Sequence, residues 1–300
     1  MAGRVATRMA SDPESSEQEL ARRLATAEEQ IASLRELVIR AYEDTHRATR
    51  EVLRARCDPS YRSAFAPEPL VSVRIGAYQG GDLLFDRALA SVLAQSYRNW
   101  EAIVVFDGRD EQNMRRIQTL GDERIRCIQR PRNGPYPRDR VARWRVAGSH
   151  PFNQAVAMAR GAWIAPLDQD DEWSEDHLEA LLSAALATEA EVAYGVSRVV
   201  LGDGTETYFG SWPPQLGDFG FQTAIYHAGL ATFLYDANSH LVGEPADWNL
   251  ARRMLEAGVV FEFVERVVTA YYVSQDEESF GGWKAREQIH GAFVPPDREA

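Results

Sequence analysis

The chain opens with a long stretch in which apolar positions recur at alternating steps of four and three. That spacing puts the apolar side chains on one face of a helix and is the heptad pattern of a coiled coil. We expect the helix over residues 16–57, after a polar segment, residues 1–15, that predicts disorder. Two interpretations remain open: a coiled coil, and a single long helix lying on the main domain. We call the apolar positions the seam: Leu20, Leu24, Ala27, Ile31, Leu34, Val38, Ala41, Ala48 and Val52.

Residues 58–69 contain three prolines and predict a linker, because proline ends the preceding helix. Short apolar runs then alternate with amphipathic stretches up to about residue 275. Such alternation predicts an α/β fold with a doubly wound, mainly parallel sheet flanked by helices. Residues 276–300 follow no period and predict an irregular tail. The expected strands are 71–75, 100–106, 125–128, 162–167, 191–200 and 261–273, and the expected helices are 83–95, 111–120, 153–159, 177–187 and 248–257.

Acidic residues come directly after two of the expected strands. Asp107 follows the second strand, and Asp168-Gln169-Asp170-Asp171 follows the fourth. Ligands of open α/β sheets bind at the carboxyl ends of the strands. Carboxylates gathered there repel one another, and a divalent cation such as Mg²⁺ or Mn²⁺ relieves that repulsion and offsets charge on a departing diphosphate. In the alternative interpretation, the carboxylates only favour the N-terminus of the helix that follows.

Three motifs, in order, give the chain a resemblance to a known family. The stretch Ser91-Val-Leu-Ala-Gln-Ser-Tyr97 with Trp100-Glu101 is similar to the helix-to-strand junction of the family 2 glycosyltransferases. Asn153 to Gly161, followed by Leu167-Asp-Gln-Asp-Asp171, resembles their second signature, and Gly243 to Leu250 resembles the third. The resemblance covers about residues 70–275 and implies a GT-A fold, with a nucleotide-sugar-binding half, 70–171, and an acceptor half, 172–275.

The resemblance also implies a role for each matching position. Asp107 corresponds to the aspartate that bonds the base of the donor, and Tyr78 to an aromatic residue beside that base. Asp168 corresponds to the aspartate that faces the nucleotide sugar, and Asp170 to the ligand of the metal. Asp247 corresponds to the general base that deprotonates the acceptor hydroxyl.

The assignment of Asp247 as the base has two alternatives within the third motif. Glu244 is the reserve candidate for the general base. In the alternative interpretation, Asp247 is only the N-cap of a helix over residues 248–257, which Gly258 ends. The chain departs from the family where Gly76-Ala77-Tyr78-Gln79 replaces the usual Pro-Thr-Tyr-Asn and where Phe106 replaces an aspartate. These departures bear on base recognition, and a UDP-sugar is the favoured donor.

Composition and charge limit the partners and the location that we expect for the protein. The formal net charge of -12 argues against nucleic acid. Cys57 and Cys127 lack the spacing of metal ligands or a disulfide framework. The first residues lack the apolar core of a secretory signal and no run is long enough to span a membrane, which favours the cytoplasm or a peripheral place at the inner membrane face. The seam predicts a homo-oligomer formed through the N-terminal helix.

Three further groups of residues have two interpretations each. The arginines between residues 131 and 150 either include one that clamps a diphosphate or form a solvated loop. The aromatic residues between 205 and 240 either stack against an acceptor or pack in the core. The histidines, among them His227, His240 and His290, show no spacing typical of metal ligands, which favours structural roles.

Taken with the resemblance, these observations predict an inverting, hexosyltransferase-like enzyme. It would move a sugar from a nucleoside-diphosphate sugar to an acceptor hydroxyl, on a glycan or a glycolipid, with Mg²⁺ or Mn²⁺. One rival is a nucleotidyltransferase, which would want a glycine-rich loop with a lysine after the first strand; Gly80-Gly81 lacks that lysine. The other rival is a catalytically silent oligomeric scaffold.

Overall fold

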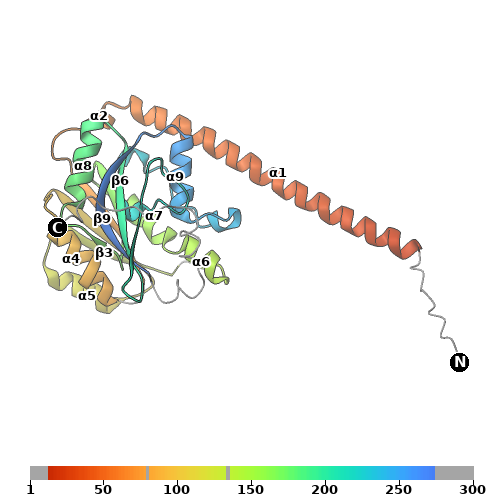
Figure 1. Cartoon of the computed structure of the whole chain (residues 1–300), viewed down its shortest axis with the longest axis horizontal. Coiled ribbons are helices and arrows are strands. Elements are labelled where there is room, and N and C mark those ends of the chain that lie inside the picture. Colours follow the sequence, from red (N-terminus) through yellow and green to blue (C-terminus); the bar gives the residue numbers. More distant parts are fainter. Residues whose placement is uncertain (1–12, 79–80, 133–135, 274–300) are drawn as a thin grey trace. The chain divides into compact units, whose positions relative to one another are not determined.

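The computed structural model describes residues 13–78, 81–132 and 136–273 (Figure 1). The chain divides into two compact units, residues 1–47 and residues 48–300. Most of the segment predicted to be disordered and all of the tail predicted over 276–300 lie outside the described residues.

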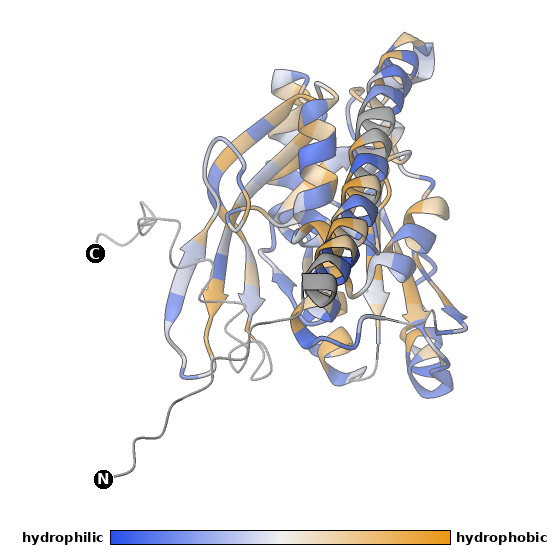
Figure 2. Ribbon diagram, turned by 90° about the vertical axis from the view of Figure 1, so that its right-hand side faces the viewer, coloured by the Kyte–Doolittle hydropathy of each residue, from blue (hydrophilic) through white to orange (hydrophobic). Residues whose placement is uncertain are grey.

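The N-terminal helix α1 spans Pro13–Cys57 and begins a few residues before the predicted start. Hydrophobic residues alternate with hydrophilic ones along it (Figure 2). Its last turns belong to the second unit, where Val52 is 1% exposed and Arg56 pairs with Glu191 at 2.5 Å. Coiled-coil formation stays a prediction. The large exposed side chains of the seam are Leu20, Leu24, Ile31, Leu34 and Val38, at 49–67%.

The segment predicted as a linker is packed against the sheet. Asp58 caps a short helix, α2 (Pro59–Ser63), so Pro59 begins a helix as well as ending one. The Tyr61 ring stacks on His227 with the ring centroids 3.7 Å apart. The backbone carbonyl of Ala64 accepts a hydrogen bond of 2.8 Å from the indole of Trp163. The segment is therefore part of the fold of the second unit.

One sheet, with nine strands in the described part of the chain, forms the centre of the second unit. Its strand order is β3-β2-β1-β4-β8-β6-β9-β5, with β7 paired to β6. The predicted α/β class is confirmed. The first four strands in this order are parallel neighbours, whereas β8 runs antiparallel to both β4 and β6. The strands are β1 (Val71–Ala77), β2 (Trp100–Asp107), β3 (Ile125–Arg130), β4 (Trp163–Asp168), β5 (Glu172–Trp173), β6 (Val192–Val200), β7 (Glu206–Phe209), β8 (Ala224–His227) and β9 (Phe261–Tyr272).

The sheet is therefore mixed beyond β4, where the sequence predicts a mainly parallel one. The connection from β6 to β7 is a tight turn through Gly204, which has a φ of 84°, and a turn this short joins only antiparallel strands. The parallel pairing of β6 with β9 resumes the parallel pattern farther along.

Helices cover both faces of the sheet. Figure 1 shows α4, α5 and α8 on one side and α7 and α9 on the other. The predicted helix 83–95 contains a π-helical turn, η1, and the predicted polar loop 131–150 contains α6 and the start of α7. The helices are α3 (Gly81–Leu83), η1 (Leu84–Leu89), α4 (Ala90–Ala94), α5 (Glu111–Leu120), α6 (Arg140–Val146), α7 (Ser149–Ala157), α8 (His177–Thr188), η2 (Phe221–Thr223), η3 (Ala228–Leu230), η4 (Ser239–Val242) and α9 (Ala246–Glu256).

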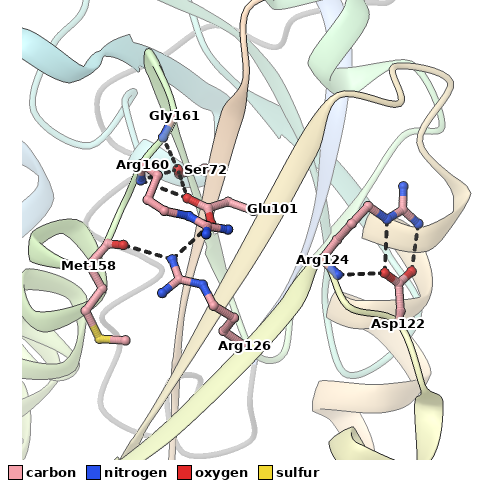
Figure 3. Close-up of polar contacts among 8 residues, drawn as sticks. All are labelled: Ser72, Glu101, Asp122, Arg124, Arg126, Met158, Arg160 and Gly161. Atoms are coloured by element: carbon pink, nitrogen blue, oxygen red, sulfur yellow. Dashed lines mark hydrogen bonds and ion pairs between the residues drawn. The ribbon is translucent and has the colours of Figure 1, made fainter.

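A buried carboxylate ties three strands together near their amino ends. Glu101, at the start of β2, is 2% exposed and accepts hydrogen bonds from Ser72, Arg126 and Arg160 (Figure 3). Burial alone would raise the pKa of Glu101, but these hydrogen bonds outweigh burial and hold that pKa below its ordinary value. Because this network lies at the amino ends of the strands, it does not occupy the opposite, carboxyl edge of β1, β2 and β4.

Candidate active site at the carboxyl edge of the sheet

The two acidic sites lie on either side of the end of β1. Strand β1 pairs with β2 on one side and with β4 on the other. In these registers Ala77 is opposite Phe106, the residue before Asp107, and Gly76 is opposite Asp168. The parallel strands thus bring Asp107, Asp168 and the chain leading to Tyr78 to one edge, as the sequence predicts.

Asp107 is held by a tyrosine from the arginine-rich segment. Its side chain is buried, and Oδ2 accepts a hydrogen bond of 2.6 Å from the Tyr136 hydroxyl. Burial and the carboxylate both raise the pKa of Tyr136, so Tyr136 donates and does not ionise near neutral pH. Sequence reasoning missed Tyr136, which stands far from Asp107 along the chain in a stretch marked mainly by its arginines.

Tyr78 and Gln169 connect the end of β1 to the acidic motif. The Tyr78 backbone N–H donates to Oε1 of Gln169 at 2.8 Å, and Nε2 of Gln169 donates to the Tyr78 carbonyl at 2.7 Å. The Tyr78 ring is 38% exposed, and the Arg132 guanidinium lies 4.5 Å from its centroid. Of the arginines between residues 131 and 150, Arg132 therefore lies against Tyr78, a residue predicted to bind the sugar nucleotide. Arg143 instead donates hydrogen bonds to backbone carbonyls of its own segment.

Asp168 is bonded to a buried arginine that sequence reasoning did not single out. Nη1 of Arg74 donates to Oδ1 of Asp168 at 2.9 Å, and Nη2 donates to the Tyr235 hydroxyl at 2.8 Å. The Arg74 side chain is 1% exposed, whereas that of Asp168 is 36% exposed. The signal available in the sequence was a charged residue within the β-rich run from Val71 to Ile75.

Asp170 and Asp171 follow β4, with Gln169 between them and the end of the strand. Asp170 is half-buried, and its carbonyl accepts a hydrogen bond of 2.9 Å from Arg87. Among the described residues, no group of three or more His, Cys, Asp or Glu side chains could hold a metal ion. A single carboxylate can nevertheless bind Mg²⁺ or Mn²⁺ when water and substrate phosphates supply the other ligands. Asp170 fits that role.

Asp247 lies in the first turn of α9. The helix begins at Ala246 with Pro245 at the N-cap, so Asp247 is not the N-cap that the alternative interpretation requires. Its Oδ2 accepts a hydrogen bond of 3.1 Å from the backbone N–H of Phe221. The Asp247 carboxylate also acts electrostatically on Arg74 and Tyr235. Asp168 and Asp247 thus share one cationic neighbour, Arg74.

Glu244 is engaged in a different set of contacts. Arg252 donates to both of its carboxylate oxygens, at 2.8 and 2.9 Å, and Asn249 donates to Oε2 at 2.8 Å. Burial alone would raise the pKa of Glu244, but these hydrogen bonds outweigh burial and lower that pKa. A carboxylate held in this way is a weak proton acceptor, so the geometry favours Asp247 over Glu244.

The aromatic residues between 205 and 240 mostly pack in the core. Phe219, Phe221 and Tyr226 are buried, whereas Trp212 is 58% exposed. His227 is buried as well. Its Nε2 lies 3.0 Å from the Tyr61 carbonyl, and its Nδ1 accepts from the Gly229 N–H, which supports the structural interpretation. His290 lies outside the described residues.

Comparison with known proteins gives a family and a fold. The family model described as Glycosyl transferase family 2 matches residues 72–243. The Escherichia coli protein named UDP-Glc:alpha-D-GlcNAc-diphosphoundecaprenol beta-1,3-glucosyltransferase WfgD is 28% identical over 131 residues, which cover 44% of this chain and 47% of WfgD. The chain spans half or less of the length of the curated relatives it matches.

Two solved structures share the fold. Staphylococcus aureus TarS, crystallised as residues 1–349 in complex with UDP, has a TM-score of 0.54 and 16% identity, covering 75% of this chain and 66% of TarS. The mannosyltransferase PcManGT from Pyrobaculum calidifontis, in complex with GDP-Man and Mn²⁺, has a TM-score of 0.51 and 15% identity, covering 82% of this chain and 72% of that one. The predicted GT-A fold is confirmed. Within residues 13–78, 81–132 and 136–273, no helix combines the length and the hydropathy that a membrane span requires.

Proposed function

This chain belongs to glycosyl transferase family 2, and we propose that it transfers a sugar from a nucleoside-diphosphate sugar to an acceptor hydroxyl with inversion at the anomeric carbon. The observation that carries the proposal is the convergence of Asp107 and Asp168 on the two sides of β1, at the carboxyl edge of parallel strands. That edge is where open α/β sheets bind their ligands.

The donor would lie along this edge. Asp107 would accept a hydrogen bond from the base, and the exposed ring of Tyr78 would lie against the base plane. Asp168 would face the sugar and ribose part of the donor. A UDP-sugar is the favoured donor, because WfgD is named for UDP-Glc and TarS was crystallised with UDP. Arg132 is well placed to reach a phosphate, since it already lies beside Tyr78.

Asp170 would hold Mg²⁺ or Mn²⁺ together with oxygens of the donor diphosphate. A bound cation would offset the negative charge that develops on the departing nucleoside diphosphate. The Mn²⁺ in the structure of PcManGT supports this assignment as an analogy of fold.

Asp247 would act as the general base. In a single displacement, the acceptor oxygen forms a bond to the anomeric carbon as the bond from that carbon to the diphosphate oxygen breaks. The hydroxyl proton passes to the Asp247 carboxylate, and the electron pair of the breaking bond leaves with the diphosphate. The hydrogen bond from Phe221 N–H holds Oδ2 of Asp247 in place.

The acceptor is proposed to be a glycan or a glycolipid. WfgD is named for an acceptor carried on diphosphoundecaprenol, which supports the second class. The cytoplasmic location, with a peripheral place at the inner membrane face, stays a prediction from the sequence. Self-association through α1 is proposed because apolar seam residues from Leu20 to Val38 are exposed along it.

The test is a screen of UDP-glucose, UDP-GlcNAc and GDP-mannose, each with and without MnCl₂. We expect at least one of these to raise the melting temperature of the protein and to be slowly hydrolysed. Thermal stabilisation without hydrolysis or transfer would favour the silent scaffold. Neither effect with any of the three would contradict the proposed donor class.

A further inference from the structure

Arg74 is a buried cation in the middle of the central strand β1. Its guanidinium donates hydrogen bonds to Asp168 at 2.9 Å, to the Tyr235 hydroxyl at 2.8 Å and to the Leu167 carbonyl at 3.3 Å. Asp168 ends β4, and Tyr235 lies in the loop between η3 and η4. A single side chain thus joins the edge that would bind the donor to the half that would bind the acceptor.

Two aromatic rings fix the plane of the guanidinium. Its central carbon lies 3.7 Å from the centroid of the Phe152 ring and 5.1 Å from that of Tyr235. Asn153 in turn exchanges two hydrogen bonds, of 2.8 and 2.9 Å, with the backbone of Tyr235. An arginine stacked on aromatic faces is attracted by their quadrupoles, and its N–H groups remain available for hydrogen bonds in the plane of the guanidinium.

Glycine at two positions makes room for this stack. A β-carbon at position 76 would collide with the Phe152 ring, and so would one at position 148, where Gly148 also has a φ of 80°. Gly76 is one of the departures from the usual family pattern. The structure gives that departure a reason, because the ring that needs the space at position 76 is the ring that stacks on Arg74.

The charge of Arg74 is permanent. Burial opposes it, but Tyr235, Asp168 and Asp247 outweigh the burial and raise the pKa of Arg74. Nε of Arg74 is buried without a hydrogen-bond partner among the described residues. An arginine buried in this way contributes little net stability, since desolvation offsets much of its attraction to the carboxylates. Stability alone is therefore a poor reason for a cation at this position.

We propose that Arg74 is a positioning residue for donor binding: it orients Asp168 toward the nucleotide sugar, while the Tyr235 hydroxyl helps to hold the guanidinium in place. The inference rests on the proposed function and names a residue that the family resemblance does not assign. Arg74 engages Oδ1 of Asp168, while 36% of the Asp168 side chain remains exposed to meet a ligand. Without Arg74, Asp168 would lose its fixed rotamer and sample solvent.

The experiment is a double-mutant cycle on the full chain, with UDP-glucose and GDP-mannose in MnCl₂ as probes and calorimetry as the readout. Arg74→Met keeps an unbranched chain in the same space, and Asp168 is exposed enough to stay hydrated when its partner is removed. We expect Arg74→Met and Asp168→Asn each to weaken the affinity about tenfold, the loss typical of a charge-assisted hydrogen bond. The double variant should bind no more weakly than the weaker single variant, because Arg74 acts through Asp168.

A matched control separates positioning from general stability. Arg126 also pairs with a buried carboxylate, Glu101, near the amino ends of the strands (Figure 3). Arg126→Met should lower the melting temperature and leave the affinity for the sugar nucleotide unchanged. Arg74→Lys keeps the charge but has no planar fork, so we expect about threefold to tenfold weaker binding.

Each outcome decides the proposal. Parent-like affinity in Arg74→Met, or in Arg74→Lys if the methionine variant does not fold, overturns it. Losses that simply add in the double variant also overturn it, because they mean that Arg74 does not act through Asp168. If the parent protein binds neither probe but binds another nucleotide sugar, the cycle is run with that ligand. If it binds none, the proposed function fails and this inference fails with it.

Discussion

The backbone of Tyr78 and the side-chain amide of Gln169 exchange two hydrogen bonds, of 2.8 and 2.7 Å. The pair joins the end of β1 to the residue between Asp168 and Asp170. The ring proposed to meet the base and the carboxylates proposed to meet the sugar and the metal are thereby held as one unit.

Gln169→Leu should therefore weaken donor binding more than it weakens the fold. Both hydrogen bonds lie at the surface, so we expect the melting temperature to change little. Loss of about 1 kcal/mol of positioning corresponds to roughly fivefold weaker affinity for the nucleotide sugar. Calorimetric titration of the parent and the variant measures this, and equal affinities would remove Gln169 from the site.

Asp247→Asn should slow transfer about 100- to 10,000-fold, because the amide cannot accept the acceptor proton. Donor affinity should stay close to that of the parent. The melting temperature should change little, since the amide oxygen of the variant side chain can still accept the hydrogen bond from Phe221. Turnover, donor affinity and melting temperature are measured on the same preparation.

Glu244→Gln is the counterpart. It should lower stability by weakening the contacts with Arg252 while keeping most of the turnover. If Glu244→Gln instead lost turnover and Asp247→Asn kept more than about a tenth of it, the assignment of the base would have to be reversed.

Asp170→Asn should abolish transfer and make donor affinity insensitive to Mn²⁺. In the parent, we expect a chelator to stop transfer and MnCl₂ to restore it, because Asp170 would hold the ion that offsets charge on the diphosphate. Asp203→Asn, in the exposed turn before β7, is the control and should behave as the parent. Full transfer in excess chelator would refute the metal assignment.

His177 should make the fold sensitive to mild acid. It is fully buried, it stacks on Trp173, and burial lowers its pKa to about 3. The unfolded chain, with a histidine pKa near 6.5, then binds more protons than the folded one, so stability is complete above about pH 6.5 and falls as the pH drops toward 3. The expected slope is about 1.4 kcal/mol per pH unit from this one group.

Urea unfolding between pH 7.5 and 5 measures that slope. His177→Leu should flatten it by the contribution of one group, although the variant is less stable overall. His227, whose pKa is also lowered by burial, keeps contributing in the variant. His46→Gln, at an exposed position of α1, is the control. Identical slopes in the parent and in His177→Leu would show that His177 is not the sensor.

Leu34→Glu should reduce self-association, because it places a charge in the exposed part of the seam. Ala32→Glu adds the same charge to α1 outside the seam and should leave association unchanged. Analytical ultracentrifugation of the full chain distinguishes the variants. A monomeric parent, or an equal effect of both substitutions, would argue against association through the seam.

The sequence predicted six of the nine strands that the structure describes, and the acidic edge, because their signal is local. The short strands β5, β7 and β8 were missed. An apolar run that ends in Asp107 or Asp168 fixes both the strand and the place of the carboxylate, and the parallel registers of β1, β2 and β4 then follow. The helix over 111–120 was predicted to the residue, since Asp110 caps its start and Gly121, with a φ of 65°, ends it. The GT-A fold followed from motifs of this kind.

The contacts that complete the site are long-range, and no local pattern encodes them. Tyr235 meets Arg74 across 161 positions of sequence, and Tyr136 meets Asp107 across 29. The start of α7 was missed because Pro151 and the neighbouring arginines obscure its apolar period. The segment 58–69 was predicted as a linker because its prolines were taken as terminators, although Asp58 followed by Pro59 is also a start signal.

The stack around Arg74 also constrains how this chain can evolve. A side chain at position 76 is blocked while Phe152 is present, and removing Phe152 alone would uncover a buried cation. Gly76 can therefore be exchanged only together with Phe152 and Arg74, so single steps that begin at position 76 or 152 pass through impaired intermediates. Among relatives, arginine at the position of Arg74 should be inherited together with glycine at the position of Gly76, marking a separate lineage within the family.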